Sequence, residues 1–275
     1  SVEYTKDQLT VINHDQGPML VVAGAGTGKT AVITSRIARL ILSGKARPEE
    51  VLALTFTEKA ADEMQQRVDE ALPYGYLDTQ IMTFHALAER VLREYGLDVG
   101  VSPEFQILTD VQQNIIIQEV LSDAKYKYYS PQHDPFGFAD TIKSAISRLK
   151  DEGMDYESFA KIMESNKSKL DEDSAVAMSD FREIYKKYSE LMQEKNSLDF
   201  GDMLIKLQHL LQSRKNIKHD ISKGFKYVLV DEFQDTNAMQ MKIIINLLDQ
   251  NKNIMVVGDD DQAIYRFRGA SVANI

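Results

Sequence analysis

One stretch of the sequence decides the fold: Met19-Leu20-Val21-Val22-Ala23-Gly24-Ala25-Gly26-Thr27-Gly28-Lys29-Thr30. A short apolar run leads directly into a glycine-rich turn, and apolar residues at helical spacing follow over residues 31–42. Short apolar runs bounded by turn residues are typical of the buried strands of a parallel sheet. The stretch therefore predicts a strand, a tight turn and a helix, which is how a βαβ unit begins.

The glycine-rich turn has the composition of a phosphate-binding loop. Glycines let the backbone curl so that successive N–H groups point at phosphate oxygens, and the following helix N-terminus adds partial positive charge. Lys29 would reach the β- and γ-phosphates, and the Thr30 hydroxyl would ligate Mg²⁺. The alternative is a glycine-rich turn without a ligand, which the Gly28-Lys29-Thr30 ending disfavours. The predicted phosphate loop comprises Ala23, Gly24, Ala25, Gly26, Thr27, Gly28, Lys29 and Thr30.

The rest of the chain predicts an α/β fold with an insertion. Further short apolar runs occur at residues 51–54, 80–83, 227–230 and 254–257. Between the run at 80–83 and the run at 227–230, the pattern changes to long helical segments. We therefore expect a parallel sheet flanked by helices, formed by residues 1–87 and 222–275, with an inserted all-helical subdomain at residues 88–221. Within the insertion we expect helices at 111–121, 141–150, 175–193 and 200–211, and a loop at 126–138.

Two acidic residues, Asp231 and Glu232, follow the predicted strand at 227–230. Ligands of open α/β sheets bind at the carboxyl ends of the strands, so this pair would face the phosphate loop. Asp231 would hold Mg²⁺ through water, because Mg²⁺ keeps much of its hydration shell. Glu232 would orient and deprotonate an attacking water. The alternative is an exposed acidic pair at a strand end. Gln234 extends this turn without an assigned role.

The strand predicted at 254–257 ends in Gly258-Asp259-Asp260-Asp261-Gln262. The amide of Gln262 could sense whether a γ-phosphate is present. Tyr265 and Phe267 then stand two residues apart among arginines, Arg268 included. This spacing suits base stacking combined with neutralisation of a nucleic-acid backbone. The alternative is that both aromatic side chains belong to the core.

Composition excludes several classes of protein. The 275 residues carry a formal net charge of −10, which argues against a polyanion binder driven by overall charge. Absence of cysteine excludes disulfides, a zinc ribbon and an iron–sulfur cluster within this sequence. No apolar run reaches the roughly 18 residues needed to span a membrane, and the polar residues 1–7 do not resemble a secretory signal. We therefore expect a cytoplasmic protein without a membrane partner.

Two long segments resemble motifs of superfamily 1 DNA helicases of the UvrD/Rep/PcrA family. Asp231-Glu232-Phe233-Gln234-Asp235-Thr236-Asn237 is similar to the second helicase motif of that family, and residues 258–270 are similar to its third. The family also has an alanine at the head of its phosphate loop, as here at Ala23. Its third motif usually has tryptophan where this chain has Phe267. The resemblance covers nearly the whole chain, and residues 126–138 match least.

The resemblance implies roles for further residues. Gln8 matches a glutamine that reads the adenine edge, and Arg36 matches an arginine beside the nucleotide. Residues 55–61 resemble a segment that grips single-stranded DNA, and residues 83–85 resemble another strand-binding motif. Taken alone, the histidine of that second motif would more often be structural. The DNA-binding residues implied by the resemblance are Phe56, Thr57, Lys59, Thr83, Phe84, His85, Tyr265, Phe267 and Arg268.

By this resemblance, the chain is the N-terminal ATP-binding portion of a motor that couples ATP hydrolysis to 3′–5′ translocation on single-stranded DNA and to duplex unwinding. Its implied ligands are ATP and Mg²⁺, and its implied partners are single-stranded and partly duplex DNA. In the family, a second RecA-like domain follows the third motif and supplies an adenine-stacking tyrosine and arginines that reach the γ-phosphate. This chain ends at Ile275, so we expect it to be nearly inactive alone.

Three other interpretations stay open. A helicase–nuclease subunit of the RecB or AddA kind shares the same early motifs. A nucleotide-binding module without turnover is disfavoured because Lys29, Thr30, Asp231, Glu232 and Gln262 are all present. An unrelated P-loop kinase or transporter ATPase would not explain the segment from Asp259 to Ala270, and no transporter-type Leu-Ser-Gly-Gly-Gln signature occurs.

Overall fold

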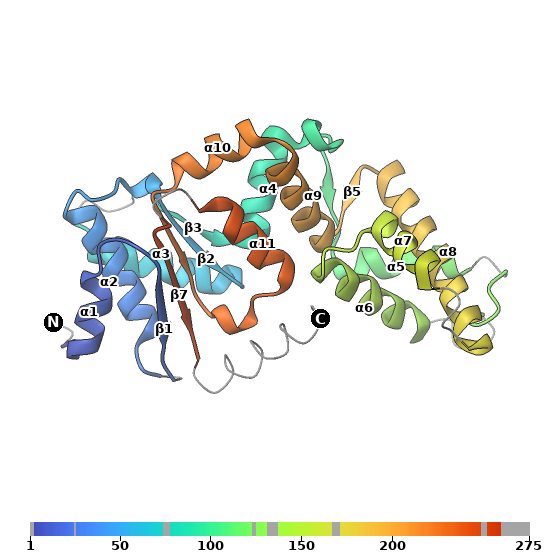
Figure 1. The fold of residues 1–275 in the computed structure, drawn as a ribbon, viewed down its shortest axis with the longest axis horizontal. Helices are drawn as coiled ribbons and strands as arrows, with labels where there is room; N and C mark the ends of the chain where they lie inside the picture. Colours follow the sequence, from blue (N-terminus) through green and yellow to red (C-terminus); the bar gives the residue numbers. More distant parts are fainter. Residues whose placement is uncertain are drawn as a thin grey trace. The chain divides into compact units, whose positions relative to one another are not determined.

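The computed structural model describes residues 3–24, 26–73, 78–122, 125–130, 137–166, 171–248 and 252–259. Contacts within the chain divide it into two compact units (Figure 1). The first unit comprises Ser1–Leu87, Leu211–Thr236 and Gln240–Ile275, and the second comprises Ala88–Leu210 and Asn237–Met239. The sequence pattern predicts that the insertion ends at residue 221. The helix at Lys215–Gly224, which spans that position, lies in the first unit.

The first unit contains a five-stranded sheet in the order β1-β7-β6-β2-β3. Every neighbouring pair is parallel, which confirms the predicted α/β fold. The strands occur where the apolar runs predicted them. They are β1 (Met19–Val22), β2 (Val51–Thr55), β3 (Gln80–Thr83), β6 (Tyr227–Val230) and β7 (Ile254–Gly258).

The strand register brings the carboxyl ends of the strands to one edge of the sheet. Val22 pairs with Gly258 at the ends of β1 and β7, and Thr55 pairs with Thr83 at the ends of β2 and β3. At the end of β6, Val230 pairs with both Leu54 and Val256. The segments that follow all five strands therefore start from the same edge, where open α/β sheets bind ligands.

The central strands β2 and β6 are buried along their whole length, as is usual for parallel strands that helices cover. On one face, Ile33, Ile37 and Leu40 join Met64 and Val68 in a buried core. These residues come from α2 and α3, which also contact each other (Figure 1). The helices of the first unit are α1 (Lys6–Asn13), α2 (Lys29–Leu42), η1 (Pro48–Glu50), α3 (Glu58–Ala71), α10 (Lys215–Gly224) and η4 (Phe233–Asp235), with α4 (Phe84–Tyr95), α9 (Phe200–Ser213) and α11 (Ala238–Leu247) shared between the units.

The second unit is mainly helical around a core that includes Ile142, Ile184 and Tyr188. It is not entirely helical, which corrects the predicted all-helical insertion: β4 (Gln106–Ile107) and β5 (Ser197–Leu198) form a parallel pair. Strands of two residues are too short to produce a sequence pattern. The other helices of this unit are η2 (Gly96–Val99), α5 (Asp110–Leu121), α6 (Gly137–Asp151), α7 (Tyr156–Asn166) and α8 (Glu172–Glu194).

Several element boundaries differ from the predicted ones. The loop expected at residues 126–138 overlaps α6, which begins at Gly137. The helix expected from residue 175 begins three residues earlier, at Glu172, because the Asp171 side chain accepts a hydrogen bond from Ser174 N and caps it. Among the helices that the structure describes, none combines the length and apolar character needed to cross a lipid bilayer.

Candidate functional site

The glycine-rich loop joins β1 to α2 at the carboxyl edge of the sheet. Gly26 and Gly28 have φ values of 75° and 82°, a left-handed conformation that glycine adopts without strain. Gly28 is also the N-cap of α2. The Thr27 hydroxyl donates a hydrogen bond of 2.7 Å to Gly24 O, and Ala23 N donates to Gly258 O at 3.0 Å. A left-handed loop that opens a helix is a ready site for an anion.

Gln8 lies against this loop. Its Oε1 accepts a hydrogen bond from Thr5 N at 2.8 Å, and Gln8 N donates to the Thr5 hydroxyl, so the two residues form a capping box that starts α1. Its Nε2 donates to Thr27 O at 3.0 Å. The same nitrogen lies 3.5 Å from the position of a Cβ at Gly28. The structure therefore brings together the predicted adenine-reading residue and the predicted phosphate loop.

Lys29 is the first residue of α2, and its side chain reaches two carboxylates on other elements. Its Nζ lies 4.0 Å from Glu232 Oε2 and 3.8 Å from Asp259 Oδ2. The Lys29 side chain is 11% exposed, so its charge lies inside the site. Segments that follow β1, β6 and β7 thus converge around one ammonium group.

Asp231 and Glu232 follow β6 and have different environments. Asp231 is buried, its N donates to Leu54 O at 3.1 Å, and its Oδ1 accepts from Glu232 N at 2.8 Å. Burial raises the pKa of the Asp231 carboxyl. Glu232 has a left-handed φ of 47°, an uncommon conformation for a residue with a side chain, and its side chain is 46% exposed. The Asp231 carboxylate is therefore buried, whereas the Glu232 carboxylate is partly exposed to solvent.

The donor set here fits a magnesium ion that a bound triphosphate shares. Asp231 provides a buried carboxylate that a cation would stabilise, and Thr30 stands in the first turn of α2. Mg²⁺ is usually held by one or two protein side chains together with water and substrate phosphates. The described part of the chain holds no group of three or more His, Cys, Asp or Glu side chains that could bind a metal ion.

Gln234 links the turn after β6 to the end of β7. Its Nε2 donates a hydrogen bond of 2.5 Å to Glu232 Oε2, and its Oε1 accepts one of 3.1 Å from Asp259 N. The sequence assigns no role to Gln234 and does not predict the contact between Asp259 and Lys29. The signal available in the sequence was that both residues follow strands of a parallel sheet.

The predicted DNA-binding residues in segments 55–61 and 83–85 lie at the carboxyl ends of β2 and β3, and they differ in exposure. Thr57 and Lys59 are exposed, and Phe56 and His85 are partly exposed. The Thr57 hydroxyl also caps α3 by accepting from Ala60 N at 3.1 Å. Exposed and partly exposed side chains at this edge are available to a ligand.

Thr83 and Phe84 are buried, at 3% and 1% exposure. The Thr83 hydroxyl donates to Glu58 Oε1 at 2.8 Å and accepts from Ala86 N at 3.0 Å. The Phe84 ring packs against Phe56 with centroids 5.5 Å apart. These two side chains support the neighbouring elements, whereas the resemblance had implied that they contact DNA themselves.

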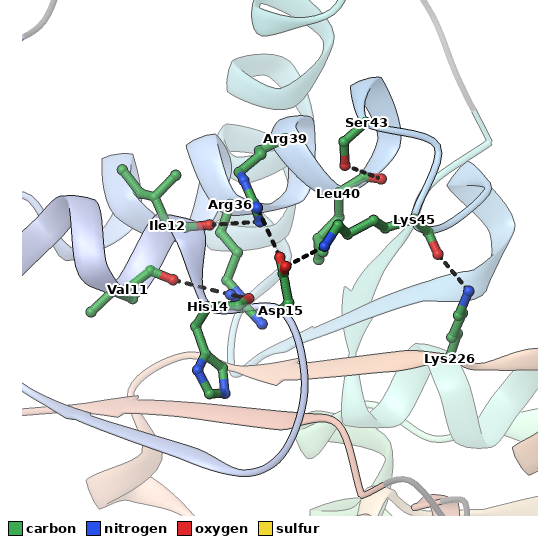
Figure 2. Close-up of polar contacts among 10 residues, drawn as sticks. All are labelled: Val11, Ile12, His14, Asp15, Arg36, Arg39, Leu40, Ser43, Lys45 and Lys226. Carbon is green, nitrogen blue, oxygen red and sulfur yellow. Dashed lines mark hydrogen bonds and ion pairs between the residues drawn. The ribbon is translucent and has the colours of Figure 1, made fainter.

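Arg36 is also buried, at 3% exposure, and Figure 2 shows where its side chain goes. Its Nη1 donates to Val11 O at 3.0 Å and to His14 O, which are carbonyls at the carboxyl end of α1. Burial lowers the pKa of the Arg36 guanidinium to about 10. The resemblance implies a position for Arg36 beside the nucleotide; in the structure its hydrogen bonds fasten α1, the helix that carries Gln8.

Five site predictions fall outside the described residues, and the structure adds nothing to them. They are Ala25, Gln262, Tyr265, Phe267 and Arg268.

A parallel sheet with a glycine-rich loop after its first strand, and with carboxylates around the lysine of that loop, defines a P-loop α/β protein. The chain belongs to the UvrD/REP helicase family, because the model of the UvrD/REP helicase N-terminal domain matches residues 4–275.

Curated relatives agree with this assignment. The chain is 36% identical to a probable DNA helicase II homolog of Rickettsia conorii. It is 35% identical to proteins named ATP-dependent DNA helicase PcrA from Leuconostoc citreum and from Bacillus subtilis. Each comparison covers 98% of this chain, but only 39%, 34% and 34% of the respective relatives. The chain therefore corresponds to little more than a third of these proteins.

Proposed function

We propose that this chain is the N-terminal ATP-binding portion of an ATP-dependent DNA helicase that moves 3′–5′ on single-stranded DNA and unwinds duplexes. The observation that carries the proposal is the convergence on Lys29: Glu232 Oε2 at 4.0 Å and Asp259 Oδ2 at 3.8 Å. A phosphate loop and a strand-end acidic turn that meet at one edge can act on the same triphosphate. The names of the relatives favour DNA as the second ligand.

In this proposal each element of the site has one task. The loop from Ala23 to Gly28 and the Lys29 ammonium bind the phosphates of ATP. Thr30 and Asp231 would hold Mg²⁺, which when bound would supply positive charge to the phosphate oxygens. Glu232, the more exposed carboxylate, orients the attacking water and accepts its proton.

The remaining nucleotide contacts are assigned by the family resemblance. Gln8 reads the adenine edge from α1, and its hydrogen bond to Thr27 O places it beside the loop. Gln262 senses the γ-phosphate. Arg36 contributes by holding the carboxyl end of α1 rather than by contacting the nucleotide.

Single-stranded DNA would cross the edge formed by the segments after β2 and β3. Phe56 stacks on a base, Thr57 and Lys59 contact phosphates, and His85 contacts the strand nearby. Thr83 and Phe84 keep these residues in place from beneath. Tyr265, Phe267 and Arg268 extend the DNA contacts beyond β7.

A second RecA-like domain in the full-length protein would complete the site. An arginine supplied from another domain can be worth about 10³–10⁵ in the rate of phosphoryl transfer. We also propose that residues 1–87 and 222–275 form one discontinuous ATP-binding domain with residues 88–221 as its insertion. The 275-residue chain should then fold, bind nucleotide weakly and hydrolyse ATP slowly.

The test compares ATP hydrolysis by the full-length protein and by this chain, with and without single-stranded DNA, and unwinding of duplexes with 3′ or 5′ tails. We expect fast DNA-stimulated hydrolysis and unwinding of 3′-tailed duplexes by the full-length protein only. Fast stimulated turnover by the 275-residue chain would show that no second domain is needed. Preference for 5′-tailed duplexes would refute the assigned direction.

A further inference from the structure

Gln234 and Lys29 belong to one closed ring of polar contacts. Lys29 Nζ approaches Glu232 Oε2 at 4.0 Å and Asp259 Oδ2 at 3.8 Å. Gln234 closes the ring on the other side, because its amide bonds both Glu232 Oε2 and Asp259 N. Four residues from three separate elements are thereby connected through direct polar contacts.

A glutamine has the chemistry that this position requires. Its amide supplies a donor for a carboxylate and an acceptor for a backbone N–H at the same time. A glutamate would keep the acceptor but would set a second carboxylate against Glu232. A methionine would fill similar space without either hydrogen bond. Gln234 is 9% exposed, so water cannot easily replace these partners.

Gly258 makes room for the Gln234 amide at the end of β7. A Cβ at Gly258 would lie 3.1 Å from Gln234 Oε1 and 3.6 Å from Gln234 N. Contacts of about 3.1 Å to a Cβ force the neighbour to move, so a larger residue here would push the amide away from Asp259 N. The close approach of the turn after β6 to the end of β7 therefore depends on both Gln234 and Gly258.

We propose that Gln234 is a positioning residue that couples the Glu232 carboxylate to the backbone that leaves β7. This inference rests on the proposed function, in which Glu232 orients water and the segment after Asp259 carries the γ-phosphate and DNA contacts. A change in the position of Asp259 N when DNA binds would be transmitted through Gln234 to Glu232. Hydrogen bonds to a carboxylate oxygen fix its direction, and its direction determines how water is held.

The experiment uses the full-length protein with Gln234→Ala, Gln234→Met and Gln234→Glu. Gln65→Ala is the matched control, because Gln65 also bridges two side chains in the first unit: its Nε2 donates to Asp69 Oδ1 and its Oε1 accepts from the Thr79 hydroxyl. The measurements are kcat and KM for ATP with and without single-stranded DNA, the Kd for Mg²⁺–ADP, the Kd for single-stranded DNA, and Tm.

We expect Gln234→Ala and Gln234→Met to lower the DNA-stimulated kcat by about 10- to 100-fold, as misplacement of a catalytic group does. KM and both Kd values should stay within about twofold, because neither ligand loses a direct contact. Because the DNA-stimulated kcat falls, DNA should barely accelerate ATP hydrolysis by Gln234→Ala and Gln234→Met. Gln234→Glu should lower kcat with and without DNA alike, because its acceptor still bonds Asp259 N while its charge repels Glu232. Gln65→Ala should behave as wild type.

Several outcomes would overturn the inference. The ratio of stimulated to unstimulated kcat could survive in both Gln234→Ala and Gln234→Met, or Gln65→Ala could reduce it equally. If Gln234→Ala fails to fold, Gln234→Met decides, because its side chain keeps the packing. Failure of both to fold would assign Gln234 to the fold alone. A wild-type protein without DNA-stimulated hydrolysis would instead refute the proposed function.

Discussion

The rings of Phe56 and Phe84 pack with their centroids 5.5 Å apart and their planes tilted by 47°. Phe84 is 1% exposed, whereas Phe56 is partly exposed. The buried ring follows β3, and the ring that it supports follows β2. Only Phe56 can offer a face to a base, so the two phenylalanines should respond differently to substitution.

Phe56→Ala in the full-length protein should weaken binding of single-stranded DNA by about 1–3 kcal/mol, the usual worth of one stacked base. Its effect on Tm should be small. Phe84→Ala should instead destabilise the protein by about 3–5 kcal/mol, because a cavity replaces a buried ring. Fluorescence anisotropy with a labelled oligonucleotide and thermal unfolding measure the two effects. Equal DNA affinity in wild type and Phe56→Ala would remove Phe56 from the DNA site.

Lys59→Ala should weaken DNA binding at low salt and reduce the slope of log K against log salt by about 1, as expected for one lost phosphate contact. Phe56→Ala should leave that slope unchanged, because stacking releases no counterion. Lys242→Ala is the control, since Lys242 is an exposed lysine on α11. A slope that is identical in wild type and Lys59→Ala would show that Lys59 makes no phosphate contact.

Lys29→Ala should abolish ATP turnover by the full-length protein, because the ammonium near Glu232 and Asp259 would no longer reach the phosphates. Folding should survive, since the helix that begins at residue 29 keeps its buried face. Steady-state hydrolysis and the affinity for Mg²⁺–ADP measure the effect, with Lys161→Ala on α7 as the control. Retained turnover would mean that the phosphate loop has been misplaced.

Arg36→Ala should destabilise the protein by about 1–3 kcal/mol, because His14 O loses the hydrogen bond from Arg36 and Val11 O keeps only the one from His14 N. The loss should appear in chemical denaturation without nucleotide, because the contacts lie within the protein. Arg67→Ala, at an exposed position of α3, should change stability by less than about 0.5 kcal/mol. Unchanged stability in Arg36→Ala, with a weaker affinity for ATP, would restore the role beside the nucleotide.

Gly201→Ala should disturb a buried charge cluster in the second unit. A Cβ at Gly201 would lie 2.7 Å from Lys150 Cβ, and Lys150 Nζ lies 2.6 Å from both Asp199 Oδ2 and Asp202 Oδ1. We expect a loss of about 1–3 kcal/mol, the usual cost of overpacking. Gly224→Ala is the control, because its Cβ would meet nothing within 4 Å. Urea unfolding compares the two, and equal stabilities would show that Lys150 can move freely.

Asp15 should make stability depend on pH in the acid range. Hydrogen bonds from Lys45 and Arg39 lower the pKa of Asp15 to about 2 (Figure 2). A carboxyl whose folded pKa is depressed stabilises the protein above its unfolded pKa, and that stability is lost as pH falls toward the folded pKa. Wild type should therefore exceed Asp15→Asn in Tm by a constant amount between pH 7 and about 5. The difference should shrink only below that range, and a difference that disappears near pH 6 would contradict this.

The residue sequence was sufficient for the elements that local chemistry specifies. Apolar runs such as Val51–Leu54 predicted the strands, because a strand buried on both faces needs continuous apolar residues. Glycines at positions 26 and 28 predicted the tight loop, because both adopt a left-handed φ. The acidic turn at Asp231 could be placed at the same edge, because all strands of a parallel sheet end there.

Only the tertiary structure decided which side chains meet. The carboxylate of Asp259 beside Lys29, the amide of Gln234 between two elements and the burial of Phe84 all depend on contacts between segments far apart in the chain. The contact of Arg36 with the carboxyl end of α1 likewise joins segments that are far apart in the chain. Periodicity reports whether a side chain is buried, but partners are set by strand order and register, which bring distant residues within a few ångströms.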